Sequence, residues 1–358
     1  MMKRKLIITI SVAASVAFLL LGHVSQVSGA QSTDKVYEFS YNNVTSSTHR
    51  NATHVIEPWV QLVSEKTNGR IKIAVYHNCA LGPTNSTWQD VNNGIYDIGG
   101  ANLPYFADTE LFPLTVANLP FAFDNSLIAV KVLNKYAKRY ESSIFKKSLL
   151  LSIGSTDPVD LFSKKPVRSL SDLKNLKTRV GGRIDVELVK AWGGVPVTMK
   201  FTDMYESLSK NIIEASLFNP VGVTGNRLYE VAPYLTVIRL STVQFPYFIN
   251  RKSFEKLPKD LQDIFMKECA PKLGEFYAQS YFEEGKNILE VIKKHLSDSK
   301  KEGGIIHLSE ADLKKMREPS KAIWDSWVKD ADKKGYQGEE MIKHFKQVMQ
   351  EEGAPLPF

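Results

Sequence analysis

The sequence predicts an α/β fold of two lobes, followed by long helices at the C-terminal end. Three observations lead to this prediction. The chain has 358 residues, more than a single hydrophobic core usually supports. Strand-like and helix-like segments alternate in two separate stretches, which is typical of mostly parallel sheets covered by helices. Apolar residues then recur at helical spacing from Lys259 to about Lys301, which predicts one long helix.

The first stretch supplies the elements of one lobe. Its periodicity predicts strands at 36–41, 70–75 and 95–101 and helices at 54–66 and 85–93. The helix at 54–66 places Val55, Trp59, Leu62 and Val63 on one side, as expected for a helix that covers a sheet. Asn68 and Gly69 end that helix before the next strand.

The second stretch supplies the other lobe. It predicts strands at 149–154, 161–163, 176–180, 195–199 and 212–216, a helical turn at 171–175, and helices at 185–192 and 202–210. Thr202 is the expected N-cap of the last of these helices. Lobes of this type bind ligands at the carboxyl ends of their strands. We therefore expect a cleft in which polar loops of the two lobes meet.

The C-terminal third is predicted to be helical. The long helix at 259–301 should be interrupted or bent near Pro271, and helices of this length commonly brace both lobes. A second helix is expected from about Glu310 to Ala331 and carries Trp324 and Trp327. A short helix should precede Pro355.

The first 30 residues have the pattern of an export signal. A basic start at 3–5 is followed by an apolar run from Leu6 to about Gly22 and by small residues up to Ala30. The alternative is a membrane anchor, but no basic cluster follows the apolar run. The pattern therefore predicts cleavage after Ala30 and a periplasmic protein, with no cysteine at the cleavage point to carry a lipid.

The charge and the cysteines exclude several classes of site. Without residues 1–30 the net charge falls from +7 to +4, because 43 basic residues then face 39 acidic ones. The lysines are interspersed with acidic residues, which argues against a nucleic-acid partner, while a mildly positive field favours anions. Cys79 and Cys269 are expected to be two lone buried thiols, although a disulfide is the open alternative. No zinc motif is present, so neither metal nor cofactor is expected.

Three stretches carry motifs that occur together in one family. The first contains GRIKI at 69–73, LG at 81–82, NGIYDIG at 93–99 and NLPFAF at 118–123. The second contains SDLKNLKTRV at 171–180, GGVPV at 193–197 and FTDMY at 201–205, and the third NP at 219–220 and LPKDLQ at 257–262. In this order they resemble the periplasmic solute receptors of tripartite ATP-independent periplasmic (TRAP) transporters, the dicarboxylate and sialic acid receptors.

The resemblance implies a two-lobed periplasmic binding protein fold with strands that cross between the lobes and a long bracing C-terminal helix. Lobe I is then expected at 31–156 with about 243–285, and lobe II at 157–242 with about 286–358. The resemblance further implies a small organic anion in the interlobe cleft, small and large integral-membrane partner subunits, and a monomeric receptor. A sensor that presents its closed form to a signalling receptor is the alternative.

The resemblance also suggests which residues bind the ligand. Arg179 should pair with a ligand carboxylate through its planar fork of N–H donors, and the amide of Asn219 should donate to the same carboxylate. Phe218 stands where the family commonly has an acidic residue, which leaves the register of Asn219 open by one position. Asn42, Asn102 and Tyr105 follow strands at the cleft. Each residue also has an ordinary alternative, as a surface ion pair, turn residue, cap or packing residue.

Two absences indicate a small ligand of low polarity. Val159 stands where the sialic acid receptors have a second arginine, and an acidic residue found near the equivalent of Asn102 in those receptors is missing here. The ligand is therefore expected to be a monocarboxylate, with an apolar or aromatic part. An aromatic wall of the cleft could comprise Phe201, Phe218, Phe245, Tyr247 and Phe248. His49 is expected at the surface or behind the residues that bind the ligand.

An enzyme is the least favoured class. The sequence contains no G-x-S-x-G, no phosphate loop ending in Gly-Lys-Ser and no H-E-x-x-H. Glu187 and Asp203 could form a carboxylate pair, but both occupy ordinary helix positions. The sequence therefore predicts a binding protein without catalytic residues.

Overall fold

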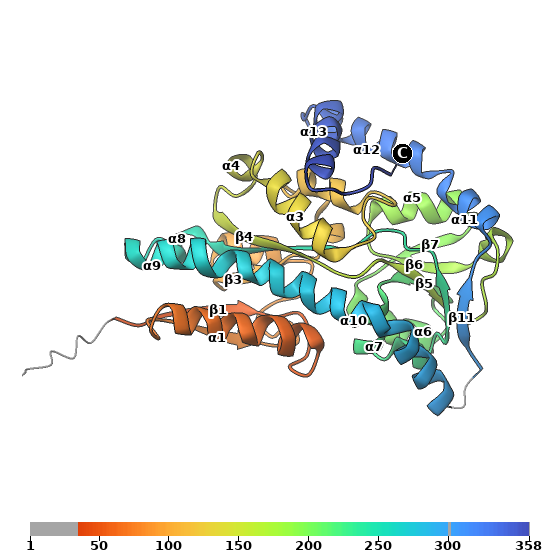
Figure 1. Cartoon of the computed structure of the whole chain (residues 1–358), viewed down its shortest axis with the longest axis horizontal. Coiled ribbons are helices and arrows are strands. Elements are labelled where there is room, and N and C mark those ends of the chain that lie inside the picture. The colour runs from red at the N-terminus through yellow and green to blue at the C-terminus, as the bar shows by residue number, and fades with distance from the viewer. Residues whose placement is uncertain (1–34, 300–301, 358) are drawn as a thin grey trace, which may run out of the picture. The chain divides into compact units, whose positions relative to one another are not determined.

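The structure is a computed structural model that describes residues 35–299 and 302–357. The expected export signal and its cleavage point lie outside these residues. The described chain contains two separate sheets, one of five and one of six strands. Figure 1 shows them with the helices that cover them. The predicted α/β fold with two sheets and a long helix is confirmed.

The first sheet has the strand order β2-β1-β3-β10-β4. Its strands are β1 (Tyr37–Asn42), β2 (Ile71–Tyr76), β3 (Ile98–Gly100), β4 (Ser148–Ser155) and β10 (Gln244–Asn250). β1 is parallel to β2 and β3, whereas β10 is antiparallel to β3 and β4. Because β10 returns from the second sheet, this sheet is mixed rather than mostly parallel.

The second sheet has the order β11-β9-β5-β8-β6-β7. Its strands are β5 (Asp160–Ser163), β6 (Lys177–Val180), β7 (Val195–Thr198), β8 (Ala215–Phe218), β9 (Tyr234–Val237) and β11 (Gly304–His307). β5 is antiparallel to β8 and β9, and the other pairs are parallel. This sheet is also mixed, because β5 enters it directly from β4.

The helices cover both sheets. They are α1 (Glu57–Lys66), α2 (Thr87–Asn93), α3 (Ser126–Ala137), α4 (Glu141–Ile144), α5 (Arg183–Ala191), α6 (Met204–Ser209), α7 (Pro220–Gly225), α8 (Arg251–Phe254), α9 (Lys259–Ile264), α10 (Ala270–Ser299), α11 (Glu310–Arg317), α12 (Ser320–Lys333) and α13 (Gly338–Glu351). The first of them follows a π-helical turn at Ala52–Ile56 and buries Trp59 and Val63, as its spacing predicts.

Two chain segments connect the two sheets, and these segments lie side by side. The chain passes from β4 to β5 through residues 156–159 and returns from β9 to β10 through residues 238–243. The two segments bond to each other: the N–H of Thr156 donates to the carbonyl of Val243 at 2.9 Å, and that of Leu240 to the carbonyl of Val159 at 2.8 Å. The predicted connection between the lobes is thus present, although these residues lie between strands rather than in them. We call residues 156–159 and 238–243 the crossing segments.

The long helix touches both sheets. α9 continues through a π-helical turn at Phe265–Cys269 into α10, whose second residue is Pro271. A proline lacks the N–H that a regular helix would use, so the interruption lies where it was expected. α10 packs against β4 and α3 and also against α7 and β11, and Figure 1 shows it running past both sheets.

The last two helices pack beside the first sheet. The indole of Trp327 on α12 stacks on Phe112 with ring centres 5.1 Å apart, and its Nε1 donates to Thr115. α13 packs against α12 and α3. The expected boundaries place this region with the second lobe. α12 also contacts α5, which follows β6 of the second sheet, and the boundaries stay a prediction. Pro319 separates α12 from α11.

Three local expectations differ from the structure. Thr202 does not cap α6, because the N-cap position is Asp203 and Thr202 lies in a 3-10 turn at Phe201–Asp203. β8 begins at Ala215 rather than at Ile212, which is 52% exposed. α13 has 14 residues and is not short.

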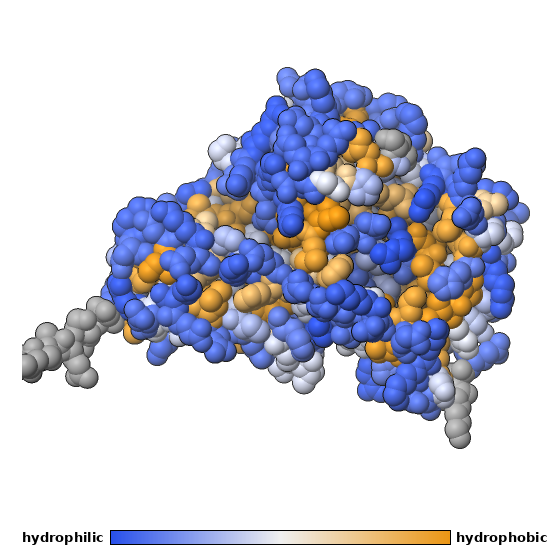
Figure 2. Space-filling model, in the orientation of Figure 1, coloured by the Kyte–Doolittle hydropathy of each residue, from blue (hydrophilic) through white to orange (hydrophobic). Residues whose placement is uncertain are grey.

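The surface is mostly polar. Figure 2 shows hydrophilic residues over most of one face, with separate apolar patches near the centre of the view and around α6 and β11. Within residues 35–299 and 302–357, no helix is both long and apolar enough to cross a membrane.

The close approach of α10 to β4 gives a stability prediction. A Cβ on Gly274 would lie 2.7 Å from the backbone oxygen of Ile153, whereas one on Gly285 would meet only ordinary contact at 3.5 Å. Gly274→Ala should therefore lower the free energy of unfolding by about 1–3 kcal/mol, as overpacking does. Gly285→Ala on the same helix should leave it unchanged or raise it by up to about 1 kcal/mol. Urea unfolding measures the free energy of unfolding of both variants. Equal values would contradict the close approach of Gly274 to the backbone of Ile153.

Candidate functional site

A cavity lies where the two sheets, the crossing segments and α10 meet. Its lining combines residues from all four parts of the structure. They include Tyr41, Asn42 and Asn102 beside the first sheet, Arg179, Phe201, Phe218 and Asn219 beside the second, Thr156, Val159 and Val243 on the crossing segments, and Tyr277 and Tyr281 on α10. The carboxyl ends of β1, β6 and β8 point to this cavity, as the α/β pattern predicts.

Arg179 is held rigidly at the cavity wall. It lies on β6, and its side chain is almost completely buried. Its Nε donates to the carbonyl of Met199 at 3.1 Å, and one terminal nitrogen donates to the carbonyl of Leu217 at 3.3 Å. The other terminal nitrogen donates to the hydroxyl of Tyr105 at 3.0 Å. These three bonds fix the plane of the guanidinium.

The charge of Arg179 has no ion-pair partner among the described residues, although the carboxylate of Asp185 interacts with it through space. None of the described carboxylates forms an ion pair with it, and Asp185, the acid nearest in the chain, instead accepts the N–H of Gly181 at 3.1 Å. A guanidinium has five N–H donors, so one hydrogen on each terminal nitrogen is left after the three bonds. A buried cation without an anion is costly. The two free donors are suited to the two oxygens of a ligand carboxylate.

Asn219 lies at the end of β8, two residues beyond the Leu217 carbonyl that holds Arg179. Its Nδ2 donates to Asp157 at 2.5 Å, and the N–H of Val221 donates to the other oxygen of the same carboxylate at 3.0 Å. Burial raises the pKa of Asp157 to about 7, against the opposing effect of these donors. Asp157 was not predicted, because nothing in the local sequence shows that a crossing segment passes behind Asn219.

Asn102, Tyr105 and Asn42 take different places. Asn102 lines the cavity, and its Oδ1 is buried without a hydrogen-bond partner in the described part of the chain. Tyr105 lies behind Arg179, where its hydroxyl accepts from the guanidinium and from the N–H of Phe201 at 2.8 Å. Asn42 also lines the cavity, but its amide bonds the backbone of Leu81 and Gly82. Of the three, Asn102 has the side chain that remains available to a ligand.

Aromatic rings form much of the remaining wall. Phe201 and Phe218 are stacked with ring centres 6.2 Å apart, and Phe245 stacks on Tyr277 at 5.5 Å. Tyr247 also lines the cavity. Phe248, expected in the same wall, points the other way and packs on Trp88 in the core. Alternation along β10 explains this, since successive residues face opposite sides of a sheet.

The tyrosines of α10 and the polar residues after β1 extend the site beyond the predicted residues. Tyr277 and Tyr281 are one helical turn apart, and their rings stack with centres 4.7 Å apart. Asn51 donates to the hydroxyl of Tyr247 at 3.4 Å. Two tyrosines at helical spacing were visible in the sequence, but their side of α10 could not be assigned without the sheets.

His49 was expected at the surface or behind the site, and it lines the cavity instead. It is only 6% exposed, and burial lowers its pKa to about 4. Its Nδ1 accepts the N–H of Asn51 at 3.0 Å, so the ring is neutral with its hydrogen on Nε2. A Cβ on Gly225 would come within 2.6 Å of that nitrogen. The glycine therefore allows α7 to approach the loop that carries His49.

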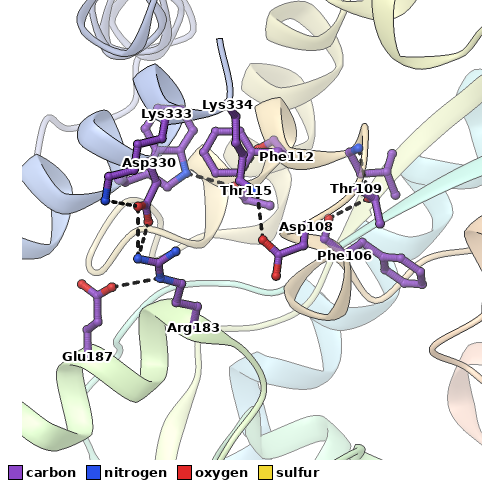
Figure 3. Close-up of polar contacts among 12 residues, drawn as sticks. Phe106, Asp108, Thr109, Phe112, Thr115, Arg183, Glu187, Asp330, Lys333 and Lys334 are labelled. Carbon is purple, nitrogen blue, oxygen red and sulfur yellow. Dashed lines mark hydrogen bonds and ion pairs between the residues drawn. The ribbon is translucent and has the colours of Figure 1, made fainter. Parts of the chain in front are cut away.

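Charged residues surround one side of the cavity. Arg183 of α5 pairs with Asp330 of α12 at 2.8 Å and with Glu187 at 3.3 Å, and Lys334 pairs with Asp108 at 2.8 Å. Figure 3 shows the two groups beside Phe112 and Thr115. Glu187 is thus engaged with an arginine and does not form the carboxylate pair with Asp203 that enzymatic use would require. The side chain of Arg183 is half exposed, so its ion pairs contribute at most about 1 kcal/mol.

Both cysteines are free thiols. Cys269 is buried, as expected, while Cys79 is partly exposed. The expected disulfide alternative is therefore not realised in this structure.

The sequence model of a known family matches residues 41–330. Its description is bacterial extracellular solute-binding protein, family 7 (DctP). The chain belongs to this family. The resemblance to the solute receptors of TRAP transporters is thereby confirmed, and the family consists of solute-binding proteins for transport rather than enzymes.

Curated relatives of this family 7 protein are distant. A solute-binding protein of Sulfitobacter sp. (strain NAS-14.1) is 26% identical over 223 residues, which are 60% of this chain and 66% of that protein. This chain thus spans slightly less than two thirds of that relative. The 2,3-diketo-L-gulonate-binding periplasmic protein YiaO of Escherichia coli (strain K12) is 25% identical over 294 residues, 80% of this chain and 85% of YiaO.

Solved structures of TRAP solute-binding proteins share the fold of this family 7 protein. One from Rhodoferax ferrireducens T118, in complex with copurified benzoate, has a TM-score of 0.80 at 19% identity and covers 89% of this chain and 99% of its own. One from Bordetella bronchiseptica, with bound (R)- and (S)-mandelate, has a TM-score of 0.76 at 22% identity. It covers 88% of this chain and 99% of its own. At these identities the likeness establishes the fold.

The pKa of Asp157 gives a prediction for the family 7 protein. A carboxyl group whose pKa is raised on folding adds stability below its unfolded value near 3.8, and this contribution is lost as the pH rises through about 7. Asp157→Asn does not titrate, so its free energy of unfolding relative to the parent should increase between pH 5 and 7. The increase is at most about 1.4 kcal/mol per pH unit.

Urea unfolding of both proteins at pH 5, 6, 7 and 8 measures the difference. His49 titrates in the opposite sense, because its pKa is lowered, but it is present in both proteins and cancels. A difference that stays constant from pH 5 to pH 8 would contradict the assignment.

Proposed function

We propose that this family 7 protein is the receptor of a TRAP transporter and captures a small organic monocarboxylate in the cavity between its two lobes. The observation that carries the proposal is the buried guanidinium of Arg179, which has two free N–H donors and no carboxylate partner among the described residues. A ligand carboxylate supplies the missing charge.

The lining of the cavity supports a single anionic group on the ligand. Val159 gives the lining an apolar side chain, and the lining cations Arg183 and Lys334 are paired with Asp330 and Asp108. The stacked rings of Phe201 and Phe218 offer an apolar surface beside the guanidinium, which lies 5.8 Å from the centre of the Phe218 ring. An apolar or aromatic body with one carboxylate fits this arrangement. The solved relatives that hold benzoate and mandelate are consistent with it.

Delivery to small and large integral-membrane subunits is part of the proposal and follows from the family. The alternative is a sensor that presents the same liganded form to a signalling receptor. Uptake of the ligand distinguishes the two functions. If the protein serves transport, deletion of the genes for the TRAP membrane subunits abolishes uptake. If it serves signalling only, uptake stays intact.

We also propose that the protein acts in the periplasm after cleavage following Ala30. The support is the basic, apolar and small-residue order of residues 3–30. Protein from a periplasmic extract should begin near Gln31 by N-terminal sequencing. Full-length protein in the membrane fraction would refute this proposal.

The site assignment predicts the effect of replacing Arg179. A charge-assisted hydrogen-bond pair contributes about 1.5–3 kcal/mol, and about 1.4 kcal/mol corresponds to a factor of ten in the dissociation constant. Arg179→Ala should therefore weaken binding of a monocarboxylate by about a hundredfold or more. Arg179→Lys keeps the charge but loses the planar fork, so its binding should lie between the two.

Titration calorimetry on protein that has been unfolded and refolded to remove bound ligand gives the comparison. Arg251 provides a matched control, because its guanidinium is also held by backbone carbonyls, those of Phe145, Lys146 and Ser148, and it does not line the cavity. Arg251→Ala should change stability but not affinity. If Arg179→Ala binds as tightly as the parent, the proposed site is wrong.

A further inference from the structure

The orientation of the Asn219 amide is determined by a neighbour. An amide's nitrogen and oxygen cannot be distinguished by shape alone, and only the hydrogen-bond partners assign them. Here the partner is the carboxylate of Asp157, whose two oxygens accept from Asn219 Nδ2 at 2.5 Å and from the N–H of Val221 at 3.0 Å. Above pH 7 the carboxylate of Asp157 is mostly ionised and therefore accepts only. The nitrogen of Asn219 therefore faces Asp157 and the oxygen faces away from it.

The oxygen of Asn219 lies on the cavity side. A Cβ on Gly222, which also lines the cavity, would come within 2.8 Å of Asn219 Oδ1. This oxygen has no hydrogen-bond donor among the residues described. A ligand carboxylate placed on the nitrogen instead would lie beside the carboxylate of Asp157, and two like charges at that separation repel.

A second amide oxygen lacks a donor in the same cavity. Asn102 is 5% exposed, and its side-chain amide forms no hydrogen bond within the described parts of the chain, so it can turn its oxygen toward a ligand. Its backbone carbonyl accepts the N–H of Tyr105, whose hydroxyl binds Arg179. Asn219 is linked to Arg179 from the other side through β8. Both residues line the same cavity as Arg179.

Acceptors in the cavity that lack a donor favour a ligand that brings one, and the oxygen of Asn102 is also buried. A site built to hydrogen-bond a hydroxyl discriminates strongly against the analogue without it, because its own polar groups then stay unpaired. We infer that Asp157 is a positioning residue that turns the oxygen of Asn219 toward the cavity, and that the receptor therefore selects organic acids with a hydrogen-bond donor beside the carboxylate, in the simplest case a hydroxyl. This inference rests on the proposed function and specifies its ligand class.

The test compares acids that differ in this one group. Mandelate has a hydroxyl beside the carboxylate, phenylacetate has none, and phenylglyoxylate has a carbonyl that accepts but does not donate. Lactate and propionate form a smaller pair of the same design. Calorimetry is done at pH 8, where Asp157 is ionised. For whichever pair of acids fits the cavity, the dissociation constant of the hydroxy acid should be at least about tenfold lower than that of its analogue without the hydroxyl.

Two variants test the role of Asp157 and Asn219. In Asp157→Asn the side-chain oxygen is needed by the N–H of Val221, so its amide nitrogen faces Asn219. The Asn219 amide then turns its own nitrogen toward the cavity, and the preference should fall to within about threefold. Asn219→Leu removes the oxygen and should lower the preference while phenylacetate still binds. Asp160→Asn is the matched control: Asp160 lies three residues from Asp157, is equally buried and accepts two backbone N–H groups, those of Ile238 and Arg239. It should keep the preference of the parent.

The outcomes separate this inference from the proposed function. Equal binding of hydroxy acid and analogue by the parent, or of mandelate and phenylglyoxylate, overturns the ligand class. A full preference in Asp157→Asn, or an equal loss in Asp160→Asn, overturns the positioning role. If none of the acids binds the refolded parent, or if Arg179→Ala binds them equally well, the proposed monocarboxylate function itself fails.

Discussion

The site depends on one buried guanidinium whose hydrogen bonds are supplied by neutral groups. Two backbone carbonyls and a tyrosine hydroxyl hold Arg179 in place, so the side chain is ordered without an ion-pair partner among the described residues. Had a carboxylate of the protein taken this place, it would have competed with the ligand for the same donors. The neutral partners fix the geometry and leave the charge for a ligand, which is the condition for a tight and orientated ion pair in a cavity.

The two crossing segments add a second constraint. They join the sheets by backbone hydrogen bonds, and they carry two buried carboxylates, Asp157 and Asp160. Asp157 accepts the N–H of Val221 and the amide of Asn219, and Asp160 accepts the N–H groups of Ile238 and Arg239. Burial raises the pKa of both. A buried acid is expensive unless it is well bonded. These residues therefore tie the connection between the sheets to the start of α7 and to the end of β9, both close to the cavity.

The sequence predicted the elements better than their surroundings. The positions of most strands and of the interrupted long helix followed from periodicity, because burial on one face leaves a local pattern. The mixed sheets were not predictable in this way, since β5 and β10 change sheets and alternation along a strand says nothing about its neighbours. Trp324 and Trp327 were recognised as helical, but their packing depends on contacts more than 200 positions away in the chain, with Pro120 for Trp324 and with Phe112 for Trp327.

In the candidate site, too, some residues could be predicted from the sequence and others only from the fold. Arg179, Asn219 and Asn102 come from motifs and lie at the cavity, whereas Tyr105 supports Arg179 from behind and the amide of Asn42 is occupied by backbone groups. Asp157, Tyr277 and Tyr281 reach the site only through the three-dimensional fold. The arginine defines which functional group a ligand must have. If the proposed site is correct, the neutral residues around the arginine act on the part of the ligand that varies among carboxylates.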